Sequence, residues 1–217
     1  MKGKAGVVIS APTLFQVARQ ATLIPPTSAR PHDLAPGLTA VVFAAASLEA
    51  LMNEVAELAD VEVCAGNTDE LLQAFAESML EAERSRGSVH LKFIVASTVL
   101  AGHPYRKGSQ PYQDFSVLMS LRNAIMHLRP TTLQLGEHGD WQLGVEAVLK
   151  ELQVRRLVTS PPPNTVTSLL QEASSPPVAR WAINAAADMA QSFISLFPEP
   201  FRTDVLIDQA EVFRRLE

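Results

Sequence analysis

The stretch TAVVFAAASLEALMNEVAELAD, residues 39–60, carries the clearest structural signal in the chain. It is rich in Ala, Leu and Glu, contains neither Gly nor Pro, and follows a Pro-Gly pair at residues 36–37. Ala, Leu and Glu favour helix, whereas Pro and Gly interrupt it. The stretch therefore predicts one long helix.

Most of the remaining segments are also typical of helices. Apolar residues recur at helical spacing, and Pro or Gly punctuates the boundaries. Asn67 or Thr68 is expected to cap the helix that follows residue 60. We expect helices over 69–86, 88–102, about 113–128, 145–157, 176–197 and 204–216. GEHGD, residues 136–140, indicates a turn between two short strands or irregular pieces. The expected fold class is all-α, an antiparallel helical bundle.

The prolines suggest how the chain is organised. Residues 1–36 contain five prolines and are expected to be a loose, extended lead-in, with at most one short helix around residues 14–21. Residues 37–217 are then one helical domain, with a core over about 38–130 and a C-terminal helical extension over 143–217. SPPPN at 160–164 is the best candidate for a joint within it.

Composition limits the class of protein. The chain has 217 residues, of which 47% are hydrophobic and 19% charged, as expected for an ordered globular domain. A single cysteine, Cys64, excludes an internal disulfide framework and fits a reducing compartment. The longest apolar stretch contains Glu49 and is shorter than a membrane span requires. We therefore expect a soluble, cytoplasmic protein without membrane contact, and the high apolar fraction favours self-association.

Charge is unevenly distributed. The formal net charge is −5, which argues against non-specific nucleic-acid binding by the whole surface. Between Arg84 and Arg129, however, seven basic residues stand against one acid, Asp114, so this segment carries +6 and the remainder −11. Such a basic segment can bind a polyanion locally. A solvated basic surface without function explains the charges equally well.

LRNAIMHLRP, residues 121–130, sets polar side chains into an otherwise apolar helix that Pro130 ends. At 100° per residue, Asn123 and His127 lie opposite the core face, while Arg122 lies on a second flank. The core face is formed by Leu118, Leu121, Ile125 and Leu128, and the flank by Phe115, Met119 and Met126. A His that caps the helix and an Arg that extends to solvent remain alternatives to a functional site.

The spacing of Arg122-Asn123-Ala124-Ile125-Met126-His127 resembles the RxxxxH motif of the HEPN superfamily, which commonly begins Arg-Asn. FAAASLEALMNEV, residues 43–55, is similar to the first long helix of bacterial HEPN-like proteins and carries Glu49, Asn53 and Glu54. The resemblance covers roughly residues 38–130. It implies an antiparallel helical bundle that forms a homodimer and joins two copies of the motif.

The resemblance also implies a chemistry, because many members are metal-independent ribonucleases, toxins or defence effectors. His127 would act as acid or base toward a ribose 2′-OH and Arg122 would anchor the phosphate, with Asn123 orienting them. Glu49 and Asn53 could support Arg122 through a buried ion pair and a hydrogen bond. No metal and no cofactor is required. RNA would be bound by the basic segment, through His103, Tyr105, Arg106, Lys107 and Arg129, and either Tyr105 or Tyr112 could stack a base or simply pack.

One departure from the family concerns regulation. Members paired with a nucleotidyltransferase antitoxin often carry a Tyr two residues after the His, and Arg129 occupies that position here. A toxin silenced through that Tyr is therefore disfavoured, although an antitoxin or another regulatory protein remains an expected partner. The alternative function is a non-catalytic HEPN-like helical dimer that binds a protein or a nucleotide. The five histidines show no metal-site spacing, and neither GxxxxGK[ST] nor GxGxxG is present.

Overall fold

A computed structural model of the protein describes residues 7–24, 35–127, 133–135, 141–143, 147–159, 168–198, 201 and 204–217, with backbone alone for 133–135, 141–143 and 204–205. The described residues are overwhelmingly helical, so the all-α class is confirmed. In chain order the helices are α1 (Ala11–Ala21), α2 (Ala35–Cys64), α3 (Glu70–Arg84), α4 (Val89–Ala101), α5 (Tyr112–Met126), α6 (Ala147–Val154), α7 (Leu169–Ala173), α8 (Pro176–Ile194) and α9 (Asp204–Val212). Leu133–Leu135 (β1) and Trp141–Leu143 (β2) pair antiparallel, so of the two arrangements left open for the flanks of GEHGD the structure shows short strands.

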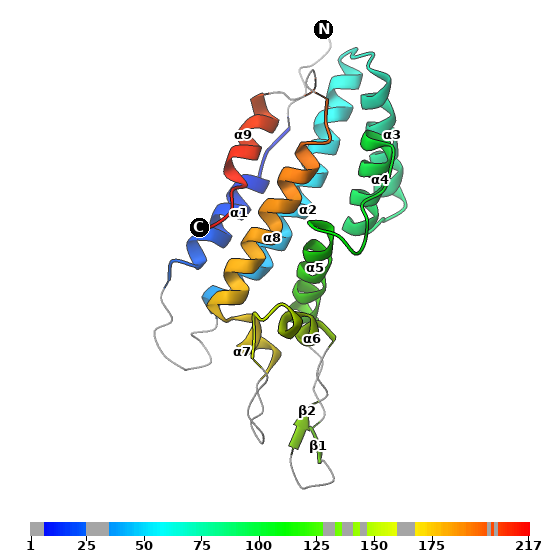
Figure 1. Cartoon of the computed structure of the whole chain (residues 1–217). Coiled ribbons are helices and arrows are strands. Elements are labelled where there is room, and N and C mark those ends of the chain that lie inside the picture. Colours follow the sequence, from blue (N-terminus) through cyan, green and yellow to red (C-terminus); the bar gives the residue numbers. More distant parts are fainter. Residues whose placement is uncertain are drawn as a thin grey trace.

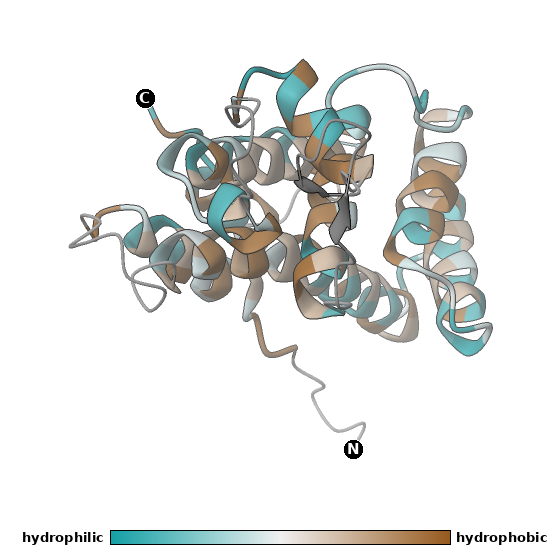
Figure 2. Ribbon diagram, turned by 90° about the horizontal axis from the view of Figure 1, so that it is seen from below, coloured by the Kyte–Doolittle hydropathy of each residue, from teal (hydrophilic) through white to brown (hydrophobic). Residues whose placement is uncertain are grey.

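Helix α2 is the central element, as the predicted helix over 39–60 leads one to expect. It packs against α1, α3, α5 and α8, so all of these helices share one core. Figure 1 places α3 and α4 on one side of α2 and α1 and α9 on the other, and the view along the bundle in Figure 2 shows the same arrangement. By length and composition α2 could cross a membrane, yet half of its most apolar window is buried inside the bundle. A helix buried in the core of a bundle has the same apolar composition as a membrane-spanning helix, so composition alone does not distinguish the two.

A group of phenylalanine rings joins α3, α4, α5 and α8. Phe93 meets Phe193 with ring centroids 5.3 Å apart at 83°, and it meets Phe115 at 4.9 Å and 65°. Phe75 contacts Phe197 edge-on at 5.1 Å. Edge-to-face pairs of this kind add to the free energy of burial. They fix α5, the helix that carries LRNAIM, against the rest of the bundle.

The first turn of α2 lies directly against the end of α7. Gly37 is buried there, and a Cβ placed on it would lie 2.0 Å from the carbonyl oxygen of Ser174. Only glycine can occupy this position without displacing a backbone segment. The glycine that marks the start of the helix in the sequence is thus also a packing residue.

The N-terminal segment contains the short helix expected around residues 14–21, but this helix begins earlier and is packed into the core. Ala11–Ala21 form a regular helix whose Ala11, Phe15 and Ala18 are fully buried. The Ser10 side chain does not cap this helix; instead Glu54 of α2 accepts hydrogen bonds from the backbone N–H groups of Ser10 (2.6 Å) and Ala11 (3.0 Å). Burial raises the pKa of the Glu54 carboxyl, against the effect of these two bonds. Residues 1–6 and 25–34 lie outside the described residues.

Helix boundaries also differ slightly from the sequence prediction. Neither Asn67 nor Thr68 caps α3, because Asp69 does so by accepting a hydrogen bond from the Leu72 N–H at 2.9 Å. Asn67 instead accepts a bond from the Asp69 N–H at 3.0 Å. α7 was not predicted at all, because a five-residue helix gives too little periodicity to detect.

Candidate functional site

The candidate site lies on the last turns of α5, where the helix leaves the core. Leu118 and Leu121 are fully buried, as predicted for the core face, and Ile125 is partly buried. The predicted second flank is divided, because Phe115 and Met119 are buried whereas Met126 is 54% exposed. Asn123 and His127 are exposed. Helix α5 therefore carries the polar residues of its motif into solvent at its C-terminal end.

Arg122 is held by two partners. Its Nη1 donates a hydrogen bond to Oδ1 of Asn123 at 3.0 Å, and its Nη2 lies 3.9 Å from Oε2 of Glu49 on α2. The Arg122 and Glu49 side chains are 29% and 49% exposed, so the expected ion pair exists but is not buried. A pair this exposed contributes about 0–1 kcal/mol. Its main effect is to set the direction of the guanidinium.

Asn53 does not support Arg122. Its Oδ1 accepts a hydrogen bond from Nζ of Lys92 on α4 at 2.8 Å, and Lys92 also pairs with Glu83 of α3. A hollow of about 240 Å³ between α2, α3 and α4 has these three side chains in its lining. Sequence reasoning missed Lys92 as a partner, although a lone cation in the apolar helix HLKFIVASTVL was the available signal.

His127 caps the C-terminus of α5 through its backbone, whose N–H donates to the Asn123 carbonyl oxygen at 2.9 Å. Among the residues that the structure describes, no partner is recorded for the His127 imidazole, and the side chain is exposed. Asn123 lies one turn away, but its Oδ1 is occupied by Arg122. The Asn123 amide N–H₂ group has no such contact with Arg122 and could donate to His127 or to a phosphate.

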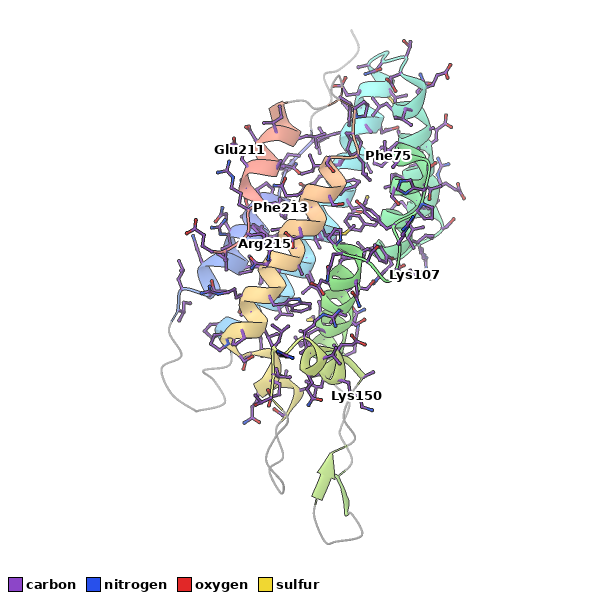
Figure 3. All side chains as sticks on the ribbon, in the orientation of Figure 1. Phe75, Lys107, Lys150, Glu211, Phe213 and Arg215 are labelled. Atoms are coloured by element: carbon purple, nitrogen blue, oxygen red, sulfur yellow. The ribbon has the colours of Figure 1, made fainter. Side chains whose placement is uncertain are left out.

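The predicted RNA-binding loop lies at the opposite end of α5. His103, Arg106 and Lys107 are exposed in the connection between α4 and α5, where Figure 3 labels Lys107. At 1.5 Å per residue, the helix separates this loop from His127 by about 20 Å. The structure therefore does not bring these residues to the motif within one subunit, and Arg129 lies outside the described residues.

The two tyrosines of this region are packed. Tyr105 stacks on Tyr112 with centroids 5.7 Å apart and planes at 19°, and its hydroxyl lies 3.1 Å from Oγ of Ser192 on α8. Burial raises the pKa of Tyr105, which the Ser192 hydrogen bond opposes. Of the two roles left open for these rings, packing is the one that the structure shows.

Neither a metal-binding cluster among the described residues nor a similar known protein helps to identify the function of this site. Within the described residues, no three His, Cys, Asp or Glu side chains are grouped so as to hold a metal ion. No protein-family model matches the chain, and no curated protein or solved structure is significantly similar to it.

Proposed function

We propose that the protein is a metal-independent endoribonuclease of the HEPN type that acts as a homodimer. One observation carries the proposal: near the exposed end of α5, Arg122 contacts Asn123 and Glu49, and the His127 side chain five residues further on is exposed to solvent. A cation and an accessible imidazole at the same end of a helix are groups that suit phosphate chemistry. The resemblance of the motif and of residues 43–55 to HEPN proteins supports the same function.

The reaction follows from these groups. The ribose 2′-oxygen attacks the adjacent phosphorus while a His127 takes the hydroxyl proton. The bond from phosphorus to the 5′-oxygen breaks, and that oxygen receives a proton, leaving a 2′,3′-cyclic phosphate and a 5′-hydroxyl. Arg122 stabilises the charge on the phosphoryl oxygens in the transition state. Two proton transfers are needed, so a second copy of the motif across a dimer would supply the second imidazole.

The test is cleavage of labelled RNA in EDTA. We expect His127→Ala and Arg122→Ala each to lower the rate at least about 100-fold. Ser120→Ala, at an exposed position on the same helix, is the matched control and should cleave like the wild type. Melting temperatures should change little for all three variants, because none of these side chains is buried. Equal cleavage by all variants would assign the activity to a contaminant or to another site.

The alternative is a non-catalytic helical dimer that binds a protein or a nucleotide. It is favoured by the fact that the contacts of Arg122 are made to Asn123 and Glu49 of its own chain, as expected for a stabilising residue. This function predicts no cleavage of any RNA and a loss of dimer on Arg122→Ala, measured by sedimentation. The ribonuclease proposal includes a toxin or defence role with an inhibitory partner protein. Expression of the wild type should then arrest growth, and His127→Ala should abolish this arrest.

A further inference from the structure

The C-terminal arm, residues 204–217, lies on the outside of the bundle. It consists of α9 and the irregular segment after it, and it rests against α1 and α8 (Figure 1). Figure 3 labels Glu211, Phe213 and Arg215 along this arm. The surface of α1 and α8 beneath it is called the arm groove below.

A row of polar side chains on α8 holds the arm. Arg180, Asn184, Asp188 and Gln191 are three or four residues apart and so share one face of the helix. Nη1 of Arg180 donates to the Glu217 carbonyl oxygen at 2.6 Å, and Oδ1 of Asn184 accepts from the Leu216 N–H at 2.7 Å. Gln191 Nε2 donates to the carbonyl oxygens of Ala210 and Phe213. The groove thus binds the backbone of the arm much as a receptor binds a peptide.

Apolar anchors complete this interaction. The Phe213 ring packs on Phe15 of α1 with centroids 4.5 Å apart, and both rings are fully buried. Leu206 is buried as well. An amphipathic helix that places apolar residues into a groove between other helices is a recurrent mode of recognition.

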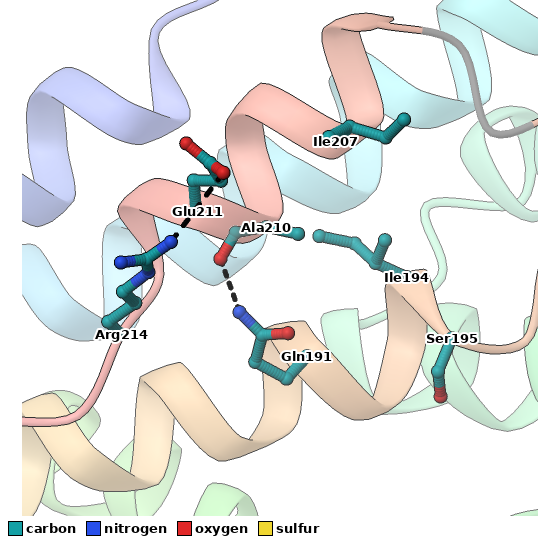
Figure 4. A pocket seen from close by; sticks show the side chains of 7 residues that line it. All are labelled: Gln191, Ile194, Ser195, Ile207, Ala210, Glu211 and Arg214. Carbon is teal, nitrogen blue, oxygen red and sulfur yellow. Dashed lines mark hydrogen bonds and ion pairs between the residues drawn. The ribbon is translucent and has the colours of Figure 1, made fainter.

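The fit of the arm is nevertheless incomplete. Gln209 is 1% exposed, and within the described part of the chain neither its amide nitrogen nor its oxygen has a hydrogen-bond partner. A hollow of about 350 Å³ remains between α8 and α9, where Ile194 faces Ile207 and Ala210 (Figure 4). An unpaired buried amide and missing packing both weaken the docking of the arm.

We propose that the arm groove releases its own arm and accepts the arm of a second copy of this chain, which gives an arm-exchanged dimer. The second arm has the same sequence, so every hydrogen bond and anchor is recovered, and the exchange costs little beyond the association itself. The weakly fitted α9 supplies a route for release. This inference is independent of the ribonuclease proposal, because it involves none of the residues at the end of α5.

Charge reversal provides the test. Nη1 of Arg215 on the arm lies 3.0 Å from Oδ2 of Asp188 in the groove. Two single variants are made, Asp188→Arg and Arg215→Asp. Each places two like charges at this contact within one chain. In a mixture of the two variants, each groove meets an arm of opposite charge only by exchange. Native mass spectrometry of the mixture, with one variant isotopically labelled, then separates heterodimer from homodimers.

We expect heterodimer to exceed either homodimer roughly tenfold, because two contacts change from repulsion to attraction, each worth a few-fold at an exposed site. The variant that carries both changes in one chain restores the pair internally and should match the wild type. A statistical mixture of dimers, or a dimer that the charges do not affect, would overturn the proposal and indicate another interface.

A second measurement covers the case in which little dimer forms. A fluorescent peptide of residues 204–217 is titrated against the full chain carrying Phe213→Ala, which weakens the internal arm and leaves the groove intact. We expect saturable binding by fluorescence anisotropy, and we expect Gln191→Ala to weaken it roughly tenfold, because two hydrogen bonds to the arm are lost. A dissociation constant of roughly 100 μM would already be weak for a peptide-binding groove. If no binding is detected up to that peptide concentration, the arm groove is not an exchangeable site.

Discussion

Helices α1 and α9 lie beside one another on the same side of the bundle, yet they are docked differently. In α1, Ala11, Phe15 and Ala18 are fully buried, and at its start Glu54 of α2 accepts hydrogen bonds from the backbone N–H groups of Ser10 and Ala11. In α9, Gln209 is buried without a hydrogen-bond partner among the described residues. Phe213, directly after α9, touches Phe15 of α1. The two regions therefore share an apolar contact but differ in whether their most buried polar side chain is hydrogen-bonded.

This difference shows where a helical bundle is firm and where it can open. A buried carboxylate that receives two donors links α1 to the centre of the fold, and removal of one partner leaves the other unpaired. A buried amide without a partner already carries that cost in the folded state. We therefore expect α1 to unfold only with the whole bundle and α9 to detach alone.

Truncation of the touching rings should give the largest effects. Phe15→Ala is expected to lower the free energy of unfolding by about 3–5 kcal/mol, because it opens a cavity under a helix that cannot detach. Phe213→Ala, its matched partner, should cost less than half as much, since loss of the arm limits the penalty. Urea unfolding measures both. Equal losses would mean that α9 unfolds together with the bundle.

Removal of the buried carboxylate should have the next largest effect. Glu54→Ala leaves the Ser10 and Ala11 N–H groups without their acceptor, so we expect a loss of about 2 kcal/mol in urea unfolding. Glu57→Ala, one turn away at an exposed position, is the control and should stay within about 0.5 kcal/mol of the wild type. Similar values for both would show that α1 does not depend on this cap.

Glu54 also gives the stability of the protein a pH dependence. Because burial raises its pKa in the fold, the folded state binds the proton more tightly than the unfolded chain does. Stability must then fall as the pH rises from the ordinary glutamate value through the raised one, and level off above it. Glu54→Gln keeps an amide oxygen as an acceptor but cannot titrate. The wild type should therefore lose stability relative to Glu54→Gln across this range, and a constant difference would contradict the assignment.

The smallest predicted effect is a gain. Gln209→Leu replaces an unpaired buried amide with an apolar side chain of similar size and should stabilise the fold by about 1 kcal/mol. Gln191→Leu, which removes the hydrogen bonds to the arm, should destabilise it. Hydrogen exchange of the α9 amides reports both changes locally. A loss of stability in Gln209→Leu would mean that the amide does have a partner in solution.

Local sequence signals predicted much of the fold but less of the candidate site. Composition and spacing found most of the helices, because periodicity is a property of neighbouring residues. The contact of Glu49 with Arg122 was also anticipated. The partner of Asn53 was not, because it depends on the position of α4 relative to α2, which no local signal encodes. For the same reason the sequence did not reveal that the basic loop and His127 lie at opposite ends of α5 within one subunit.

By itself, the sequence determined that the chain is all-helical with one long helix over residues 39–60, and that LRNAIM sets polar residues into an apolar helix. Only the tertiary structure decided that Glu54 caps α1, that Lys92 donates a hydrogen bond to Asn53, and that α8 binds the C-terminal arm. The physical reason is range. Helix formation and amphipathic spacing act over a few residues, whereas these hydrogen bonds join residues 32 to 43 positions apart, which meet only once the core has packed.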